Sequence, residues 1–520
     1  RTAKKGRKLS SLNSNIKVGN SLIDDPEVAG DLAFNWEQEF PQVFDPSLRG
    51  TKQSGFDVVV GNPPYVNVEL MPVIDKEFYK ANFRTFFKRT DLFSLFIEMA
   101  TTRLSRSGRI SFIIPSIVLN NLSYRLIRNL LLENNYLEEV CYTGNKVFHD
   151  ANVDTTILTI NKSSKIEKII LKNSLDFFNP KAQKVELDFF LKYDNNISIG
   201  NENSNDLTDK LFKDDFLLAE DYFMIFQGVV TGNNDAFIFE TKEEALQKGL
   251  DGELLFPMCH GRDISKWTIE NQRVLAYVNP EIDLLDYPGS LGWINNFKQD
   301  LEKRREVLNG VIPWYSLQWP RDRSMFLHTP KILIQNTRNE RLQPRIVAAI
   351  DEVGLFGTQG LNFIVSKKEI DIYSFLGLLN SKLINYLFST RFLNLAIKAD
   401  YLKKIKFPNK FKDSEIGNKS KELSNKSHFK FKVDANFIKL LEAKFPINKV
   451  SKKLQNWPDL DFKGFLGELK KAKVHLSLSE EAEWMAYFNE QKAKALALQA
   501  DIDRIDREID ALVYELYGLT

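Results

Sequence analysis

The chain has 520 residues and a mass of 60.1 kDa, with 43% hydrophobic and 27% charged residues, which is typical of a globular protein of two or three domains. The net charge of +2 favours no partner by itself. Two cysteines exclude a disulfide framework and favour a reducing cytoplasm, and the absence of any apolar run near the ~20 residues of a bilayer span argues against a membrane role.

The first half of the chain contains short predicted strands that end in turn residues. Residues 15–22 form a short strand pattern followed by turn chemistry at Asn20. A second strand, Phe56–Val60, runs into Gly61 and then into Asn62-Pro63-Pro64-Tyr65, which can continue neither as strand nor as helix. The second strand therefore delivers Asn62 to its carboxyl end.

The two prolines make the loop after this strand rigid, because they fix two φ angles and keep the preceding residue extended. The loop presents carbonyl oxygens, one amide side chain and one aromatic ring. Such a loop suits a planar ligand whose NH2 group needs two acceptors and whose face is covered by a ring. Adenine extruded from a duplex is such a ligand. An ordinary strand-to-loop turn closed by prolines is the alternative interpretation.

Strands and helices then alternate, which predicts an α/β fold. The pattern predicts a helix over residues 74–107 that is closed by Gly108. The elements expected after it are strands at 109–115, 136–142 and 153–160 and a helix at 123–134.

The composition turns polar from residue 163 to about 215, which predicts a connecting segment between two domains. Hydrophobic strands resume after residue 216, and residues 370–388 form an amphipathic helix pattern. Beyond residue 410 we expect a lysine-rich linker, which either faces a polyanion or is a solvated surface. An apolar stripe near the carboxyl end favours an α-hairpin over a coiled coil. The domains expected are 1–165, 166–215, 216–410 and 411–520.

The segment Asn62–Tyr65, placed after a hydrophobic strand, resembles the catalytic motif of S-adenosylmethionine-dependent amino-methyltransferases. The surrounding chain is similar to the gamma-class adenine-N6 DNA methyltransferases of type IIG restriction–modification enzymes. Segments 228–234, 260–264 and 330–335 resemble the Taq-type specificity domain. The resemblance implies the carboxyl-terminal part of a Rossmann-like methyltransferase sheet, a mixed α+β target-recognition domain and a C-terminal helical segment.

The resemblance also implies roles for individual residues. Asn62, Pro63 and Tyr65 would be catalytic, and Phe148 would stack on the flipped base opposite Tyr65. Asn20 and Asn62 would contact the cofactor, S-adenosyl-L-methionine. A core position for Phe148 and a loop-forming role for Asn20 are the alternatives.

The expected partner is double-stranded DNA. Arg262, Arg338, Arg341 and Lys398 are candidates for DNA binding, because their donors match acceptors on base edges. Each could instead be a surface ion-pair partner. The sequence predicts no recognition site.

In this family the glycine-rich cofactor loop and the acidic residue that binds the ribose lie upstream of Asn20. No Gly-x-Gly occurs in the chain. We therefore expect a C-terminal portion of a longer enzyme, or one that works with an upstream methyltransferase or nuclease portion. No zinc-ligand spacing occurs, and the Pro458-Asp459 and Glu468-Leu469-Lys470 pair is a coincidental nuclease match. Three alternative functions stay open: a non-catalytic DNA-recognition fragment, a nuclease-free phage-defence adenine methyltransferase, and an amino-methyltransferase that acts on protein or on RNA.

Overall fold

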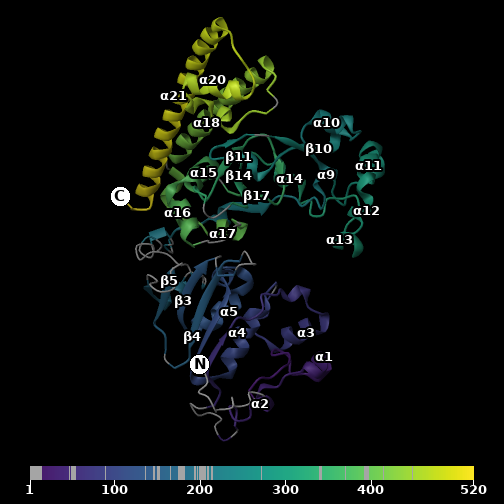
Figure 1. The fold of residues 1–520 in the computed structure, drawn as a ribbon, viewed down its shortest axis with the longest axis vertical. Helices are drawn as coiled ribbons and strands as arrows, with labels where there is room; N and C mark the ends of the chain where they lie inside the picture. Colours follow the sequence, from purple (N-terminus) through teal and green to yellow (C-terminus); the bar gives the residue numbers. More distant parts are fainter. Residues whose placement is uncertain are drawn as a thin grey trace, which may run out of the picture. The chain divides into compact units, whose positions relative to one another are not determined.

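The computed structural model describes residues 15–519 except 46, 48–53, 88, 135, 145–146, 149–152, 164, 174–181, 193–194, 196, 198–206, 208–209, 212, 214, 271, 339–341, 369, 392–396, 414 and 448. The chain forms two compact units, residues 1–204 and residues 205–520 (Figure 1). Each unit has cores of its own.

The first unit is built on a six-stranded mixed sheet with the order β1-β2-β4-β3-β5-β6. Strand β1 is parallel to β2 and β3 is parallel to β5, whereas β4 runs antiparallel to both its neighbours. The strands are β1 (Phe56–Gly61), β2 (Leu104–Pro115), β3 (Leu137–Gly144), β4 (Thr155–Asn161), β5 (Lys168–Asn173) and β6 (Ala182–Glu186). The helices are α1 (Pro26–Ala29), α2 (Trp36–Glu39), α3 (Val73–Asn82), α4 (Leu92–Arg103), α5 (Arg125–Glu133) and α6 (Leu187–Lys192).

Helices α4 and α5 pack on this sheet because their apolar residues recur at helical spacing. Phe93 and Ile97 of α4 and Ile127 and Leu131 of α5 are fully or almost fully buried in one cluster. Ile110 of β2 lies in the same cluster. The strands expected at 136–142 and 153–160 and the helix expected at 123–134 are confirmed to within two residues at each end. The strand expected at 109–115 is also present, but β2 begins five residues earlier, at Leu104.

The prediction that Gly108 closes a helix is wrong. The helical region is two helices, α3 and α4, and Gly108 lies inside β2. A β carbon at Gly108 would lie 2.7 Å from the Phe56 carbonyl oxygen and 2.5 Å from Leu104 Cγ. Glycine is therefore needed where β1 and an irregular part of β2 approach closely, which a local pattern cannot distinguish from a helix end.

The expected boundary at residue 165 falls inside the first unit, because β5 and β6 extend its sheet. Ile169 and Leu171 of β5 and Val185 of β6 are buried in the same core as β2. Their flanking polar residues made this segment resemble a linker in the sequence.

The second unit contains two four-stranded sheets with the orders β15-β14-β17-β8 and β16-β10-β13-β9. The first comprises β8 (Phe223–Gln227), β14 (Lys331–Gln335), β15 (Ala348–Asp351) and β17 (Leu361–Ser366). The second comprises β9 (Ile238–Phe239), β10 (Leu255–Cys259), β13 (Arg273–Ala276) and β16 (Phe356–Gly357). Two strand pairs complete the unit: β7 (Leu217–Leu218) with β18 (Lys406–Phe407), and β11 (Ile264–Ser265) with β12 (Thr268–Ile269).

All five residues of β14 are buried, and its three central residues, 332–334, are apolar. Ile332 and Ile334 enter a core with helices α15 (Ile372–Asn380) and α16 (Lys382–Arg391). Leu333, which points to the opposite face, enters the core shared with β10 and β13. The remaining short helices are α8 (Ala219–Tyr222), α9 (Asn234–Phe237), α10 (Lys242–Gln247), α11 (Pro288–Ile294), α12 (Lys298–Leu301), α13 (Arg305–Leu308), α14 (Arg323–Leu327) and α17 (Ala399–Lys403).

The expected lysine-rich linker after residue 410 is instead a long helix, α18 (Ile416–Lys444). It packs along α21 (Leu478–Leu516), beside which it lies in Figure 1, and against α15. Buried Ile416 and Leu423 of α18 share a core with Ile505 and Ile509 of α21, so the α-hairpin interpretation is confirmed. The helices α19 (Lys452–Gln455) and α20 (Phe462–Lys471) close a separate small core at the far end of the hairpin.

The mixed α/β class expected from the sequence is confirmed by these sheets and helices. None of the helices in the described ranges combines the length and the apolar character that a membrane span requires.

Candidate functional site

Strand β1 ends at Gly61 and delivers Asn62 to its carboxyl end, as predicted. Pro63 is buried, whereas Asn62 is exposed. Within the described part of the chain, the Asn62 side chain makes no hydrogen bond. Its amide is therefore available to a ligand, while Pro63 anchors the loop.

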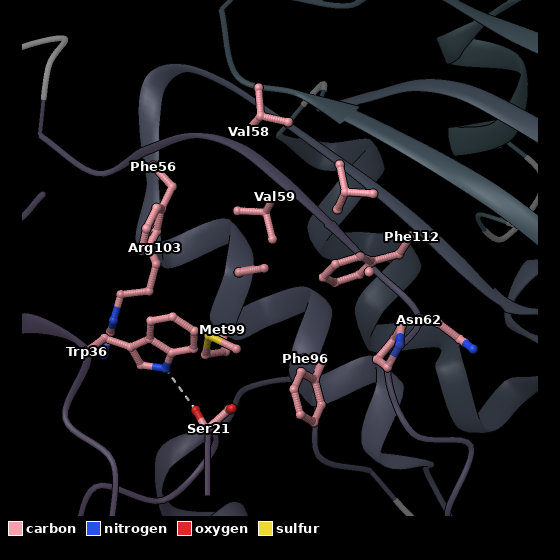
Figure 2. A pocket seen from close by; sticks show the side chains of 14 residues that line it. Ser21, Trp36, Phe56, Val58, Val59, Asn62, Phe96, Met99, Arg103 and Phe112 are labelled. Atoms are coloured by element: carbon pink, nitrogen blue, oxygen red, sulfur yellow. Dashed lines mark hydrogen bonds between the residues drawn. The ribbon is translucent and has the colours of Figure 1, made fainter. Parts of the chain in front are cut away.

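Strand β1 lines a pocket of about 350 Å³ along its length. Figure 2 shows Asn62 at the end of the pocket where Phe96 and Phe112 lie, with Trp36 and Arg103 at the other end. The indole nitrogen of Trp36 donates a hydrogen bond to the Ser21 carbonyl at 3.0 Å. The lining residues are Ser21, Trp36, Phe56, Val58, Val59, Val60, Gly61, Asn62, Pro63, Phe96, Met99, Ala100, Arg103 and Phe112.

The pocket has the size and the largely apolar lining of a small-molecule site. Aromatic and aliphatic surface, the Ser21 hydroxyl and the Asn62 amide suit a ligand such as S-adenosylmethionine in part. No carboxylate lines the pocket among the described residues, so nothing in this lining could bind ribose hydroxyls through an acidic group. The residues therefore fit the apolar and methyl-bearing parts of the cofactor and not its ribose.

Asn20 does not line this pocket, although its neighbour Ser21 does. The Asn20 side-chain oxygen accepts a hydrogen bond from the Leu22 amide at 3.2 Å. It also interacts with the hydroxyl of Tyr79. The side chain thus holds the local turn.

The rings of Tyr65 and Phe148, for which the family resemblance implies base stacking, lie close together. Their ring centroids are 6.4 Å apart with an interplanar angle of 78°. The Tyr65 hydroxyl donates a hydrogen bond to the Ile113 carbonyl at 3.0 Å, and burial raises the pKa of Tyr65. A base between two stacked rings needs about 7 Å between parallel planes, so one ring has to turn before both could cover a base.

The loop that follows the motif is attached to the start of α4. The Asn67 amide donates a hydrogen bond to one Asp91 carboxylate oxygen at 2.9 Å, and the Tyr124 hydroxyl donates to the other at 2.6 Å. Burial and the Asp91 carboxylate raise the pKa of Tyr124. The ring of Tyr124 stacks on fully buried Phe93, whose ring meets Tyr65 edge to face. Phe93 is thus a core residue that fixes the position of Tyr65.

A larger, more polar hollow of about 690 Å³ lies in the second unit. Arg262 and Arg338, two of the DNA-binding candidates, both line it. Lys398 does not, although the neighbouring Ile397 amide donates a hydrogen bond to the Asn336 carbonyl at 2.6 Å. Arg341 lies outside the described residues.

Sequence reasoning missed the other residues that line this hollow, because they come from four separate segments. They are Asn234, His260, Gly261, Gln335, Thr337, Leu342, Thr358 and Gly360. The Gly-Arg-Asp triplet at 261–263 and the polar end of β14 at Gln335 were the available signals, and neither indicates a neighbour by itself.

Parts of the chain match two known families and a domain of unknown function. Residues 1–148 match the Eco57I restriction-modification methylase family, and residues 256–406 match the TaqI-like C-terminal specificity domain. Residues 409–513, which include all of α18 and most of α21, match a domain of unknown function, DUF8810.

Similar proteins agree with these matches. The type II restriction enzyme and methyltransferase RM.Eco57I of Escherichia coli is 32% identical over 160 residues, which are 30% of this chain and 15% of that protein. The type II methyltransferase M.BstVI of Geobacillus stearothermophilus is 24% identical over 394 residues, which are 69% of this chain and 68% of that protein.

Among solved structures, the type IIL restriction-modification enzyme MmeI in complex with DNA is similar in fold. The TM-score is 0.53 at 13% identity, and the match covers 92% of this chain and 56% of that chain. RM.Eco57I and MmeI are thus both substantially longer than the part of each that this chain matches. The family resemblance expected from the sequence is confirmed by the two family matches and the type II relatives.

Proposed function

Since the chain resembles type II restriction–modification methyltransferases with a TaqI-like specificity domain, we propose that it transfers a methyl group to the exocyclic amine of adenine in duplex DNA. The observation that carries this proposal is the exposed Asn62 amide in the wall of the β1 pocket. The chain would be the modification and specificity part of a gamma-class, type IIG enzyme.

Asn62 and Pro63 would prepare the target nitrogen. The lone pair of an exocyclic amine is delocalised into the ring, which makes the amine a poor nucleophile. If the Asn62 side-chain oxygen and the Pro63 carbonyl accept its two hydrogens, the nitrogen becomes tetrahedral and its lone pair is localised. S-adenosyl-L-methionine supplies the methyl group when bound. The chain's own contribution is positioning and charge placement.

Tyr65 and Phe148 would cover the extruded base. The target atom of adenine is inaccessible inside a duplex, so the base has to leave the stack. Stacking on aromatic rings offsets part of that cost and is worth roughly 1–3 kcal/mol per base. Tyr65 is held by Ile113 and Phe93. We therefore expect Phe148 to be the ring that turns.

A further part of the enzyme would complete the cofactor site. β1 is an edge strand among the described strands of its sheet, and the residues Val58 and Val60 are 65% and 75% exposed. An exposed apolar edge strand is a site for pairing with another segment. We propose that the upstream methyltransferase portion covers β1 and supplies the ribose-binding carboxylate.

A methylation assay with labelled S-adenosylmethionine and duplex DNA tests the proposal. The protein should label DNA, and Asn62→Ala should abolish labelling, whereas Asn295→Ala, a matched change at an exposed asparagine of the second unit, should not. Sequence-specific DNA binding without labelling would instead favour a non-catalytic DNA-recognition fragment. This is the second candidate function, because the lining of the β1 pocket has no carboxylate for the cofactor ribose among the described residues.

A further inference from the structure

The polar hollow of the second unit is formed where three segments meet near the start of α9. The end of β14 contributes Gln335, Thr337 and Arg338, and the turn before β17 contributes Thr358 and Gly360. The 3-10 helix at Gly261–Asp263 contributes Arg262, which is exposed at the rim. The hollow of about 690 Å³ has no acidic residue in its described lining.

Backbone contacts hold the walls of this hollow in place. The Asn336 amide donates a hydrogen bond to the Gly360 carbonyl at 2.8 Å, and its side chain donates to the Gln359 carbonyl at 2.9 Å. A β carbon at Gly261 would lie 2.9 Å from the Gly360 carbonyl oxygen. The 3-10 helix and the turn therefore touch through glycine backbone, and the hollow exists before any ligand binds.

The carboxylate of Asp263, which directly follows the lining residue Arg262, is already neutralised. Asp263 is buried, accepts a hydrogen bond from the His260 amide at 2.8 Å and forms an ion pair with Arg273. Arg273 also pairs with Glu240 at 3.0 Å. The positive charges of Arg262 and Arg338 are consequently not offset by Asp263.

The guanidinium of Arg338 is oriented by the protein. Its Nε donates a hydrogen bond to the Pro344 carbonyl at 2.8 Å, and its Nη1 donates to the Gln335 side-chain oxygen at 3.2 Å. Gln335 is itself buried, and its Nε2 donates to the Ile264 carbonyl at 2.7 Å. Two of the five guanidinium donors thus fix the plane of the fork, so little rotamer entropy remains to be lost on binding.

The chemistry of the hollow distinguishes among ligands. Small-molecule pockets are mostly apolar, whereas Leu342 is the one large aliphatic residue in this described lining. Arginine, glutamine, asparagine, histidine and threonine offer donors and acceptors for base edges, and an arginine fork matches O6 and N7 of guanine. The lining therefore fits the major-groove edge of a base pair.

We propose that Arg338, oriented by Gln335, determines specificity by contacting a guanine of the target sequence. Arg262, at the exposed edge of the same hollow, would lie next to that contact. This inference rests on the proposed function, because it identifies how the same enzyme selects its DNA. Arg338 touches the base, and Gln335 is a positioning residue.

Selection from a random duplex library tests the proposal. The complete protein, carrying Asn62→Ala so that methylation plays no part, should enrich one sequence motif that contains a guanine. Adding Arg338→Ala should reduce the preference for guanine at one position by about ten- to a hundredfold, because a bidentate contact discriminates by that amount. Binding to DNA that lacks the motif should change little.

Matched variants separate specificity from folding. Arg305→Ala removes the same charge from an exposed position of α13 outside the hollow and should leave the motif unchanged. Arg338→Lys keeps the positive charge but loses the two-pronged guanidinium. It should therefore weaken the preference for guanine at the same motif position as Arg338→Ala does. Gln335→Met removes the oxygen that accepts from Arg338 and should weaken the preference for guanine at that motif position. Gln335→Glu keeps an acceptor oxygen and should retain part of that preference.

The inference is overturned if Arg338→Ala keeps the guanine preference, or if it weakens binding to all sequences equally, as a phosphate contact would. If Arg338→Ala does not fold, exposed Arg262→Ala provides the test, and an unchanged motif then overturns the inference. Because no step requires methylation, loss of sequence preference and loss of methyl transfer are distinguishable outcomes.

Discussion

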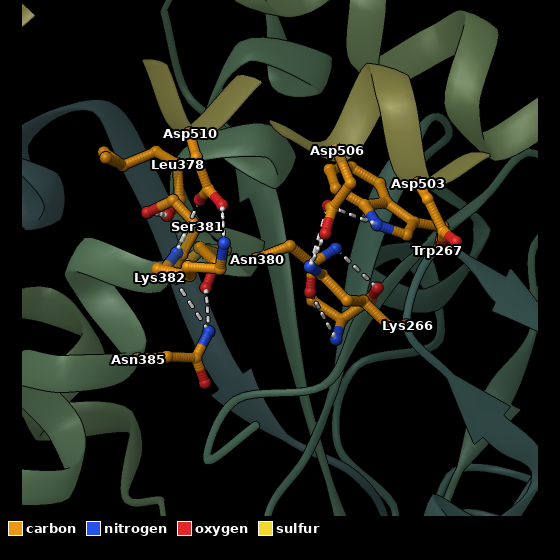
Figure 3. Close-up of polar contacts among 12 residues, drawn as sticks. Lys266, Trp267, Leu378, Asn380, Ser381, Lys382, Asn385, Asp503, Asp506 and Asp510 are labelled. Atoms are coloured by element: carbon orange, nitrogen blue, oxygen red, sulfur yellow. Dashed lines mark hydrogen bonds and ion pairs between the residues drawn. The ribbon is translucent and has the colours of Figure 1, made fainter. Parts of the chain in front are cut away.

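The carboxylate of Asp506 on α21 accepts two hydrogen bonds from the Lys266 ammonium, each at 2.7 Å. The indole nitrogen of Trp267 donates a third to the same carboxylate at 3.2 Å. Figure 3 shows these contacts beside those of Asp510, which accepts from the Lys382 amide at 2.8 Å where α16 begins. The carboxyl-terminal helix is therefore an integral part of the second unit.

Replacing Asp506 by alanine should destabilise the second unit by about 1–3 kcal/mol, because the change removes hydrogen bonds between charged groups that are mostly buried. Denaturant unfolding followed by tryptophan fluorescence measures the effect. Asp300→Ala, which breaks an exposed ion pair with Lys303, is the matched control and should change stability by less than about 0.5 kcal/mol. Equal stabilities of the two variants would contradict this role of Asp506.

Lys419 and Lys426 of α18 should contribute little to DNA binding, because acidic residues of α21 already neutralise both. Lys419 pairs with Glu508 and Lys426 with Asp501, each at 2.7 Å. Lys426→Gln should change DNA affinity less than twofold and leave its salt dependence unaltered. Arg262→Gln should instead weaken binding to the target motif more than binding to other DNA, because Arg262 lies at the proposed base contact. Affinity titrations from low to high salt, with and without the motif in the duplex, measure both effects. A reduced salt slope for Lys426→Gln would be contrary to this expectation.

Phe148→Ala should weaken methylation by roughly 5- to 150-fold through lost stacking, with a much smaller effect on folding. Phe148 is only half-buried, so its removal leaves no large cavity. Single-turnover methylation rates and thermal unfolding are the two measurements. Tyr65→Phe keeps the ring and loses the hydrogen bond to Ile113, so it should retain most activity. Parallel losses of activity and stability in Phe148→Ala would indicate a core residue.

Alkaline pH should destabilise the second unit in part through Tyr277. Burial raises the pKa of Tyr277 to about 12, and its hydroxyl donates a hydrogen bond to the Arg321 carbonyl at 2.7 Å. A folded pKa above the unfolded value of about 10 gives stability that is complete below pH 10 and is lost between pH 10 and about 12. The melting temperature should therefore fall over that window.

The matched variant for this prediction is Tyr277→Phe. It should cost about 1 kcal/mol near neutral pH, because the hydrogen bond is lost. It should also show a shallower decline above pH 10 than the unmodified protein. Identical alkaline declines of the two proteins would contradict the assignment to Tyr277.

Local sequence signals were sufficient where one segment carries the whole feature. Asn62 was found because a valine-rich strand and two prolines force a strand end at that position, and β1 has those bounds. Features that depend on distant residues were missed. Gly108 resembled a helix end, but its requirement for glycine comes from Phe56, 52 positions earlier, at a close approach of two strands.

The candidate DNA site illustrates the same limit. Arg262 and Arg338 could be proposed from residue type alone, but only the fold brings them into one hollow. The role of Gln335 depends on its contacts with Arg338 and Ile264, which no local pattern encodes. Likewise α18 resembled a linker because its lysines are frequent, and its partner acids lie in α21, more than 70 positions later.

Nucleoside mass spectrometry of DNA from cells that carry the intact gene tests the central claim most directly. Cells with the unmodified gene should contain N6-methyladenine, whereas cells with Asn62→Ala should contain none above background and cells with Asn295→Ala should match the unmodified gene. N6-methyladenine at equal levels with and without Asn62, or its absence from all three, would contradict the proposal that this loop methylates adenine.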